Sequence, residues 1–240
     1  AEYDAAVLAS TADPVDEVTE TSKAVGFLRS EHANCSAILW DNLERNPDKL
    51  AVVGPAGSLT YAQLVASAAQ WGNAFMRFGL RRGDRIPFFL DDTPAYPAAF
   101  FGAVRAGLVP VLLNTQTNAE TLAYFLADTE ARLVLCEADL RGAFYDDIVA
   151  ASAVEKIIIV NGGANAPDQV EADEFLHGMP TDLDCADTDA GDMAFWMYSS
   201  GTTGRPKGIV HLHHDMAYTQ HSYGQHVLGV RADDVCLSIP

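Results

Sequence analysis

The chain has 240 residues, 49% of them hydrophobic, which is enough to bury a sizeable core in one large or two modest domains. Its 33 acidic residues outnumber 15 basic ones and give a formal charge of -18, which excludes nucleic acid and anionic membrane surfaces as expected partners. No stretch approaches the roughly 20 apolar residues of a membrane span, and the amino terminus lacks a signal-peptide pattern.

The four cysteines lie far apart, without a Cys-x-x-Cys pair or any other short spacing that suits zinc. They are Cys35, Cys136, Cys185 and Cys236. We expect free thiols and a cytoplasmic protein.

Clear periodicity begins only after residue 35, so residues 1–35 are predicted to be a partly ordered extension. A short helix is expected to end before Pro47, followed by a hairpin around residues 54–57. Thr60 and Gln63 then form a capping box, in which each side chain accepts from a backbone N–H of the other residue. The helix that they open is expected to stop at Gly79, because glycine readily adopts the left-handed conformation of a helix end.

The next hundred residues alternate between short apolar strands and amphipathic helices. Strands are predicted at residues 85–90, 108–114, 133–136 and 156–160. Helices are predicted from Asp91 to Gly107, from a second capping box of Thr117 with Glu120, and at residues 138–151. This alternation predicts an α/β fold with a mostly parallel sheet and helices on both faces.

The predicted domains are the extension at 1–35, a first α/β subdomain at 36–160, an acidic connector at 161–191, and the start of a second α/β subdomain at 192–240. The connector is polar and broken by two prolines, with a short helix expected near 171–177. The second subdomain begins with an apolar run at 193–198 that predicts a buried strand.

That strand leads into the sequence Tyr-Ser-Ser-Gly-Thr-Thr-Gly-Arg-Pro-Lys-Gly-Ile-Val-His at residues 198–211. Its glycines, hydroxyls and two cations are typical of a loop that binds phosphate, and we expect a helix after it. It is not a Walker A loop, because Pro206 stands where the second glycine is required and Gly208 follows Lys207. An ordinary Gly/Ser/Thr surface loop is the alternative, but such loops rarely follow a buried strand directly.

The run Ser-Gly-Thr-Thr-Gly-x-Pro-Lys-Gly resembles the signature of the adenylate-forming superfamily of acyl-CoA synthetases, luciferases and peptide-synthetase adenylation domains. Leu-Thr-Tyr-x-x-Leu at 59–64 and the segment 105–114 resemble two further motifs of that superfamily. The segments 195–201, 210–216, 226–229 and 233–236 are most similar to the benzoate-CoA ligase group.

The resemblance implies a two-step reaction with Mg-ATP and coenzyme A. A carboxylate attacks the α-phosphate to give an acyl-adenylate and pyrophosphate, and coenzyme A then displaces AMP. The implied nucleotide-binding residues are Ser199, Ser200, Gly201, Thr202, Thr203, Gly204, Lys207 and Gly208. Thr203 and Lys207 are the implied catalytic residues, because they would stabilise charge on the leaving pyrophosphate.

Six residues after the loop invite a metal-site interpretation: His211, His213, His214, Asp215, His221 and His226. They lack His-x-x-x-His spacing and a thiolate partner, so the sequence favours a helix start with solvated or capping histidines over a metal site. In the superfamily the helix after the loop lies beside the acyl pocket, which implies that His214 or Tyr218 contacts the acid substrate.

Members of the superfamily are about twice as long as this chain, and their later motifs are absent. The resemblance therefore implies an amino-terminal fragment that is inactive by itself. An adenylating enzyme that loads a carrier protein, and a non-catalytic nucleotide-binding module, are the alternatives. A homodimer is compatible with the sequence, which does not decide the oligomeric state.

Overall fold

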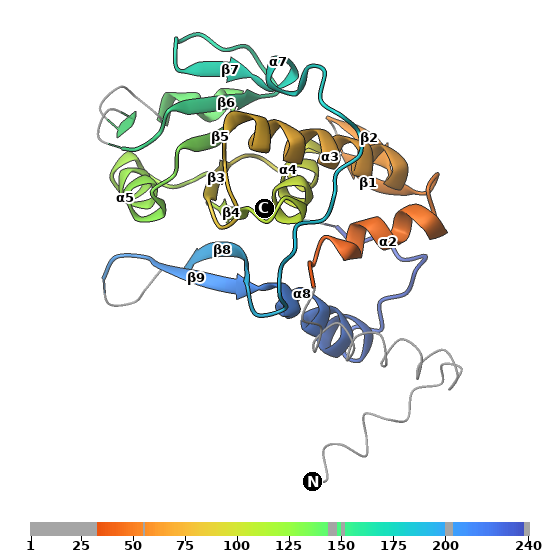
Figure 1. The fold of residues 1–240 in the computed structure, drawn as a ribbon. Coiled ribbons are helices and arrows are strands. Elements are labelled where there is room, and N and C mark those ends of the chain that lie inside the picture. The colour runs from red at the N-terminus through yellow and green to blue at the C-terminus, as the bar shows by residue number, and fades with distance from the viewer. Residues whose placement is uncertain (1–32, 55, 144–147, 150–151, 200–203, 238–240) are drawn as a thin grey trace.

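A seven-stranded sheet organises the protein, in a computed structural model that describes residues 33–54, 56–143, 148–149, 152–199 and 204–237 (Figure 1). The strand order is β7-β6-β5-β3-β4-β8-β9, and each neighbouring pair is parallel except β8 with β9. The strands are β3 (Arg85–Phe89), β4 (Val109–Leu112), β5 (Leu133–Glu137), β6 (Lys156–Val160), β7 (Gln169–Glu171), β8 (Met193–Ser199) and β9 (Lys207–Leu212). The predicted α/β class and mostly parallel sheet are confirmed.

Helices connect these strands, and a small antiparallel hairpin stands apart from the main sheet. The hairpin consists of β1 (Leu50–Gly54) and β2 (Gly57–Thr60). The helices are α2 (Ala37–Arg45), α3 (Tyr61–Phe78), α4 (Ala95–Arg105), α5 (Ala119–Thr129), α7 (Ala172–Leu176) and α8 (His213–Thr219), with a 3-10 helix η1 (Ala138–Ala143) and a π-helix η2 (Gln220–Gln225). No described helix is long and apolar enough to cross a membrane.

The ends of α3 form as the sequence predicts. The hydroxyl of Thr60 accepts from the Gln63 backbone N–H at 3.2 Å, and the Gln63 side chain accepts from the Thr60 N–H at 2.9 Å. Gly79 ends the helix with φ at 98°, a conformation that a side chain would strain. Both expectations for this helix are confirmed.

The predicted start of α5 is wrong by one residue. Asn118 caps this helix, because its side-chain oxygen accepts from the Thr121 N–H at 2.9 Å. Thr117 lies before the cap, and its own N–H donates to Asn114 O, which closes a turn. Asparagine is a better cap than threonine, but the Thr-x-x-Glu spacing of a capping box favours Thr117 in the sequence.

The helix predicted at residues 138–151 is also wrong over its first part. Residues 138–143 form the 3-10 helix η1. Residues 148–149 are helical, and positions 144–147 and 150–151 lie outside the described residues. Over so few residues, a 3-10 helix and an α-helix direct the same apolar side chains toward the sheet. The hydrophobic pattern therefore does not distinguish the two.

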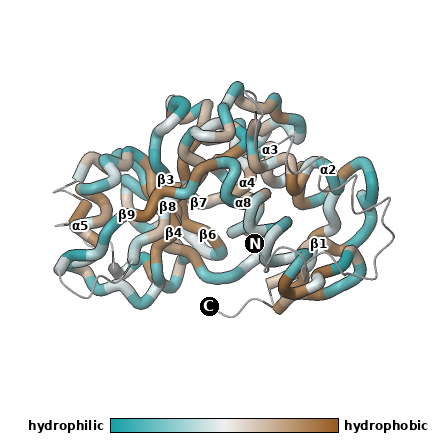
Figure 2. The backbone as a smooth tube through the Cα atoms, turned by 90° about the horizontal axis from the view of Figure 1, so that it is seen from below, coloured by the Kyte–Doolittle hydropathy of each residue, from teal (hydrophilic) through white to brown (hydrophobic). Residues whose placement is uncertain are grey.

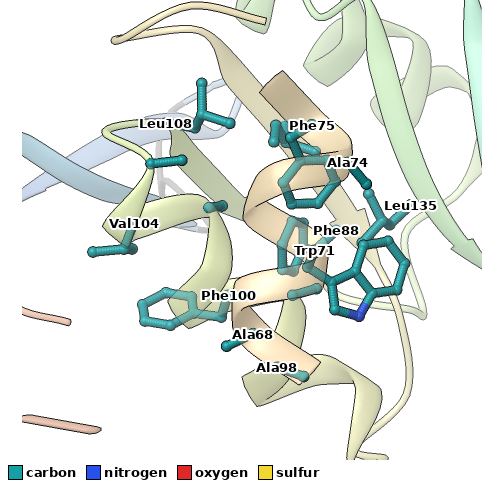
Figure 3. Packing of buried hydrophobic residues seen from close by; sticks show 14 of the residues in the cluster. Ala68, Trp71, Ala74, Phe75, Phe88, Ala98, Phe100, Val104, Leu108 and Leu135 are labelled. Atoms are coloured by element: carbon teal, nitrogen blue, oxygen red, sulfur yellow. The ribbon is translucent and has the colours of Figure 1, made fainter. Parts of the chain in front are cut away.

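Two buried clusters cover the two faces of the sheet. On one face, residues of α2, α3, α4 and α7 form a single buried cluster with alternate residues of the strands, including Phe88 and Leu135. Trp71 and Phe75 of α3 stand at the centre of this cluster (Figure 3). On the other face, α5 packs against the intervening strand residues, such as Val134 and Ile159. The predicted covering of both faces is therefore confirmed.

The segment 161–191 contributes more to the sheet than a connector would. Its residues 169–171 form β7, and α7 follows at the predicted place. The strands β8 and β9 continue the same sheet, because β8 pairs with β4. The division into two subdomains remains a prediction, while the sheet itself is continuous from β7 to β9.

Residues 33–35, which the sequence places in the extension, are buried. Asn34 fixes them in place: its Nδ2 donates to Val104 O at 2.9 Å and to the Thr188 hydroxyl at 3.2 Å. Residues 1–32 lie outside the described residues. All four cysteines are free, as expected, with Cys35 and Cys136 buried and Cys185 and Cys236 exposed.

Candidate functional site

The glycine-rich loop begins at the carboxyl edge of the parallel sheet. Val111 and Leu112 of β4 pair in parallel with Trp196 and Met197 of β8. The chain therefore leaves β8 at the same edge at which it leaves β3, β4, β5 and β6. Ligands of open α/β sheets bind outside this edge, so the loop lies where a ligand is expected.

The element after the loop is a strand, which corrects the expected helix. The strand β9 runs antiparallel to β8, with Ser199 opposite Lys207 and Tyr198 opposite Gly208. The loop therefore joins two strands of a hairpin, and in the described chain it is followed directly by a strand rather than by a helix. Phosphate binding here would depend on loop N–H groups, hydroxyls and Lys207 rather than on a helix dipole.

The predicted nucleotide-binding residues fall at both ends of this hairpin. Ser199 ends β8, Gly204 follows the loop, and Lys207 begins β9; all three are exposed. A Cβ at Gly208 would meet the rings of Tyr198 and Trp196 at ordinary contact distances. Ser200, Gly201, Thr202 and Thr203 lie outside the described residues, so their roles stay predictions.

The strand β8 is less buried than its apolar sequence predicts. Met193 and Met197 are 40% and 46% exposed, and only Ala194 is fully buried. The helices α4 and α5 cover this strand only in part, and each contacts a different face of it. Phe195 packs on Phe100 of α4 at 5.5 Å between ring centroids, and Tyr198 stacks on α5.

The helix α5 supports β8, which is the first stem of the hairpin. Tyr198 stacks on Phe125 with 3.9 Å between ring centroids, and its hydroxyl donates to Asp128 Oδ2 at 2.7 Å. Burial, and then the Asp128 carboxylate, raise the pKa of Tyr198 well above its usual range, so the hydroxyl stays protonated and remains a donor. Figures 1 and 2 both place α5 at the end of the molecule that carries the hairpin.

The same helix contacts the second stem of the hairpin, which we define as residues 204–207 at the start of β9. Tyr124 donates its hydroxyl hydrogen to Pro206 O at 3.2 Å, and the Arg205 guanidinium lies 5.4 Å from the centre of its ring. Sequence reasoning missed this support. Its signal was available, because Tyr124 and Asp128 are four residues apart and share one face of a helix.

His214 and Tyr218 lie at the opposite edge of the sheet. They belong to α8, which begins where β9 returns to the amino edge. His214 Nδ1 lies 2.9 Å from Asp215 Oδ1, and Tyr218 is 61% exposed. A six-residue strand spans about 20 Å, so the structure does not bring these two residues together with Lys207. Their contact with an acid substrate stays a prediction.

Asp215 organises the histidines at the start of α8. Its Oδ2 accepts from the Leu212 N–H at 3.1 Å and lies 3.3 Å from His211 Nδ1. The His211 ring stacks on Phe195, 4.5 Å between centroids. Asp215 therefore caps this helix, where the sequence favours solvated or capping histidines. Among the described residues, no three His, Cys, Asp or Glu side chains gather as metal ligands do.

A mostly parallel sheet that is covered on both faces, with a glycine-rich hairpin at its carboxyl edge, is the architecture of open α/β proteins, which bind their ligands at that edge. The AMP-binding enzyme family matches residues 39–240. The chain belongs to this family, which confirms the resemblance that its motifs predict.

The relatives include aryl acid-CoA ligases. A 4-hydroxybenzoate-CoA/benzoate-CoA ligase of Rhodopseudomonas palustris is 37% identical over 215 residues, 88% of this chain and 39% of the relative. A 3-hydroxybenzoate-CoA ligase of an Aromatoleum species is 38% identical over 168 residues, 69% of this chain and 31% of the relative. The chain thus spans at most about two fifths of these relatives.

Solved structures of CoA ligases share the fold. An anthranilate CoA ligase in complex with anthranoyl-AMP has a TM-score of 0.81 and 30% identity, over 84% of this chain and 39% of the other. A benzoate CoA ligase from Burkholderia xenovorans has a TM-score of 0.73 and 29% identity, over 82% of this chain and 38% of the other.

Proposed function

We propose that the chain is part of an AMP-forming carboxylic acid-CoA ligase that acts on benzoate or a related aromatic acid. Such an enzyme joins the acid to AMP with release of pyrophosphate and then transfers the acyl group to coenzyme A. The observation that carries the proposal is the family's loop sequence at the carboxyl end of β8. The names of the aryl acid-CoA ligase relatives support the substrate class.

The first step needs stabilisation of negative charge more than it needs a base. The acid is already a carboxylate at neutral pH, while pyrophosphate gathers charge as it leaves. In our proposal Mg-ATP is the substrate, and the loop hydroxyls, including that of Thr203, and its N–H groups hold the departing phosphates. Lys207 supplies a cation from an exposed position at the start of β9, where its pairing with Ser199 fixes its backbone.

Lys207→Ala in the full-length protein that contains these residues tests this role. We expect pyrophosphate-dependent ATP exchange to fall by roughly 10²–10³-fold, the usual effect of removing a group that stabilises transition-state charge. Thr203→Ala should give a smaller loss. The matched control is Lys156→Ala, because Lys156 also begins a strand but at the amino edge of the sheet. Unchanged exchange in Lys207→Ala would contradict the proposal.

The acceptor is tested by adding coenzyme A to the same protein. A benzoyl or hydroxybenzoyl thioester of coenzyme A is the expected product, and an acyl-adenylate without a thioester would favour the carrier-protein alternative. If calorimetry shows that ATP binds while no acyl-adenylate forms, the non-catalytic nucleotide-binding module would be favoured. We also propose action in the cytoplasm, where ATP and coenzyme A are supplied, and a homodimer remains a prediction.

A further inference from the structure

We infer that α5 is a positioning element for the phosphate loop, and that Tyr124 is its main positioning residue. This inference rests on the proposed function, because it assigns Tyr124 a role in adenylation. Tyr124 is not a catalytic residue in this proposal, because its hydroxyl is hydrogen-bonded to the Pro206 carbonyl and not to a ligand. Its role is to hold the peptide that leads into Lys207.

The contact of Tyr124 with the loop joins residues 82 apart in the sequence. Its hydroxyl donates to Pro206 O at 3.2 Å. Proline has no backbone N–H, so the carbonyl is the only backbone group through which Pro206 can be held by a hydrogen bond. That carbonyl belongs to the peptide bond with Lys207, and because the peptide is planar, holding its oxygen also orients the Lys207 nitrogen.

Arg205 adds a second contact to the same side chain. Its guanidinium lies 5.4 Å from the centroid of the Tyr124 ring, within the range of a cation–π interaction. Two consecutive loop residues, Arg205 and Pro206, therefore contact one tyrosine. The stem is held on one side by this tyrosine and on the other by the pairing of Lys207 with Ser199.

Tyr124 is itself held firmly enough to act as a support. Its ring contacts Tyr198 in an edge-on arrangement, 6.3 Å between centroids, and also contacts Phe125 at 5.8 Å. Phe125 is buried, and Tyr198 is bonded to Asp128. One helix face thus contacts both stems of the hairpin, so their separation is set by α5 as well as by the strand pairing.

Such support should act on the chemical step more than on nucleotide binding. A loop that is held before the reaction needs no reorganisation when charge develops on the leaving pyrophosphate. If the stem is loosened, ATP can still bind, but Lys207 is in place for a smaller fraction of the time. Loss of the Tyr124 hydroxyl should therefore lower kcat and leave KM for ATP nearly unchanged.

Tyr124→Phe in the full-length protein tests the inference, because it removes the hydroxyl and keeps the ring. We expect kcat for pyrophosphate-dependent ATP exchange to fall about threefold to tenfold, the rate equivalent of one ordinary hydrogen bond. KM for ATP should change less than about twofold. Tyr124→Leu also removes the ring under Arg205 and should lower kcat further. Tyr61→Phe is the matched control, a half-buried tyrosine on α3 outside this contact.

Hydrogen exchange of the peptide that begins at Gly204 gives a readout besides activity. In Tyr124→Phe its amides should exchange about threefold to tenfold faster, while those of β3 and β5 keep the wild-type rate. An unchanged kcat in an active enzyme would overturn the inference and leave the proposed function intact. A general rise in exchange would also overturn it, because Tyr124 would then only stabilise the fold. Absence of adenylation in the wild-type protein would contradict both the proposed function and the role of Tyr124.

Discussion

The backbone N–H of Cys35 donates a hydrogen bond to Nδ1 of His213 at 3.1 Å, joining residues 178 apart in the sequence. The accepting nitrogen carries a lone pair, so the imidazole is neutral and its proton is on Nε2. His213 is 1% exposed, and burial lowers its pKa from 6.5 to about 4. This contact ties the segment before α2 to the start of α8, at the amino edge of the sheet.

The neutral His213 makes stability depend on pH. A histidine whose pKa is lowered by folding binds a proton more readily when unfolded, so its contribution is complete above pH 6.5 and is lost as the pH falls toward 4. The loss is about 3 kcal/mol at most. In urea titrations, His213→Asn should show a smaller acid loss, because the amide oxygen accepts without titrating. His177→Asn, at an exposed histidine, is the control and should match the wild type.

Gly102 allows α3 and α4 to pack closely. A Cβ at this position would lie 2.2 Å from Ala68 O and 2.9 Å from the Gly72 nitrogen, so the helices would have to separate. Gly102→Ala should destabilise the protein by about 1–3 kcal/mol, the usual cost of overpacking. Thermal unfolding measures this loss. Gly191→Ala is the matched control, since a Cβ there meets nothing within 4 Å, and an equal effect in both variants would refute the packing argument.

The sequence predicts the sheet well because strands that are buried on both faces have uninterrupted apolar sequences. The strands β3, β5 and β6 are nearly uninterrupted apolar runs, and the amphipathic helices between them imply parallel pairing. The pairing of β8 with β4 is different. These strands are far apart in the sequence, and nothing in the polar segment before β8 indicates that the chain returns to the same sheet and extends it beside β4.

Contacts between distant segments are also what sequence reasoning misses in the candidate site. The loop residues form a continuous motif and are recognisable, but the tyrosine that contacts Pro206 lies on another element. The buried state of His213 depends on Cys35 in the same way. A histidine within a polar run is expected to be solvated. Its local sequence does not show that residues 33–35, far away in the chain, will cover it.

The bond between Tyr198 and Asp128 should be measurable as a coupling energy. Tyr198→Phe removes the donor and keeps the stack on Phe125, so we expect a loss of about 1 kcal/mol in the free energy of unfolding. Asp128→Ala should cost a similar amount. In the double variant the two losses should fall short of additivity by about 0.5–1 kcal/mol, as expected for residues in contact. Strict additivity would show that the bond adds nothing to stability.

Glu137 at the end of β5 is buried, and burial disfavours the charged form of its carboxyl group. Asn161 donates to its Oε1 at 2.7 Å, while its Oε2 is buried without a partner in the described structure. Burial raises the pKa of this carboxyl above its usual 4.5, although the Asn161 bond opposes the change. The folded protein therefore holds this proton more tightly than the unfolded chain does, and stability falls as the pH rises through the raised pKa.

Glu137→Gln removes that charge and keeps an oxygen for Asn161. At pH 8 the variant should be about 1 kcal/mol more stable than the wild type, since a buried neutral amide costs less than a buried carboxylate. Near pH 4 the two should unfold at similar urea concentrations, because the wild-type carboxyl is then protonated. The comparison cancels the effect of His213, which both proteins share. Glu44→Gln, at an exposed position of α2, should show no such dependence on pH, and a variant that is less stable at both pH values would mean that the Glu137 carboxylate stabilises the fold.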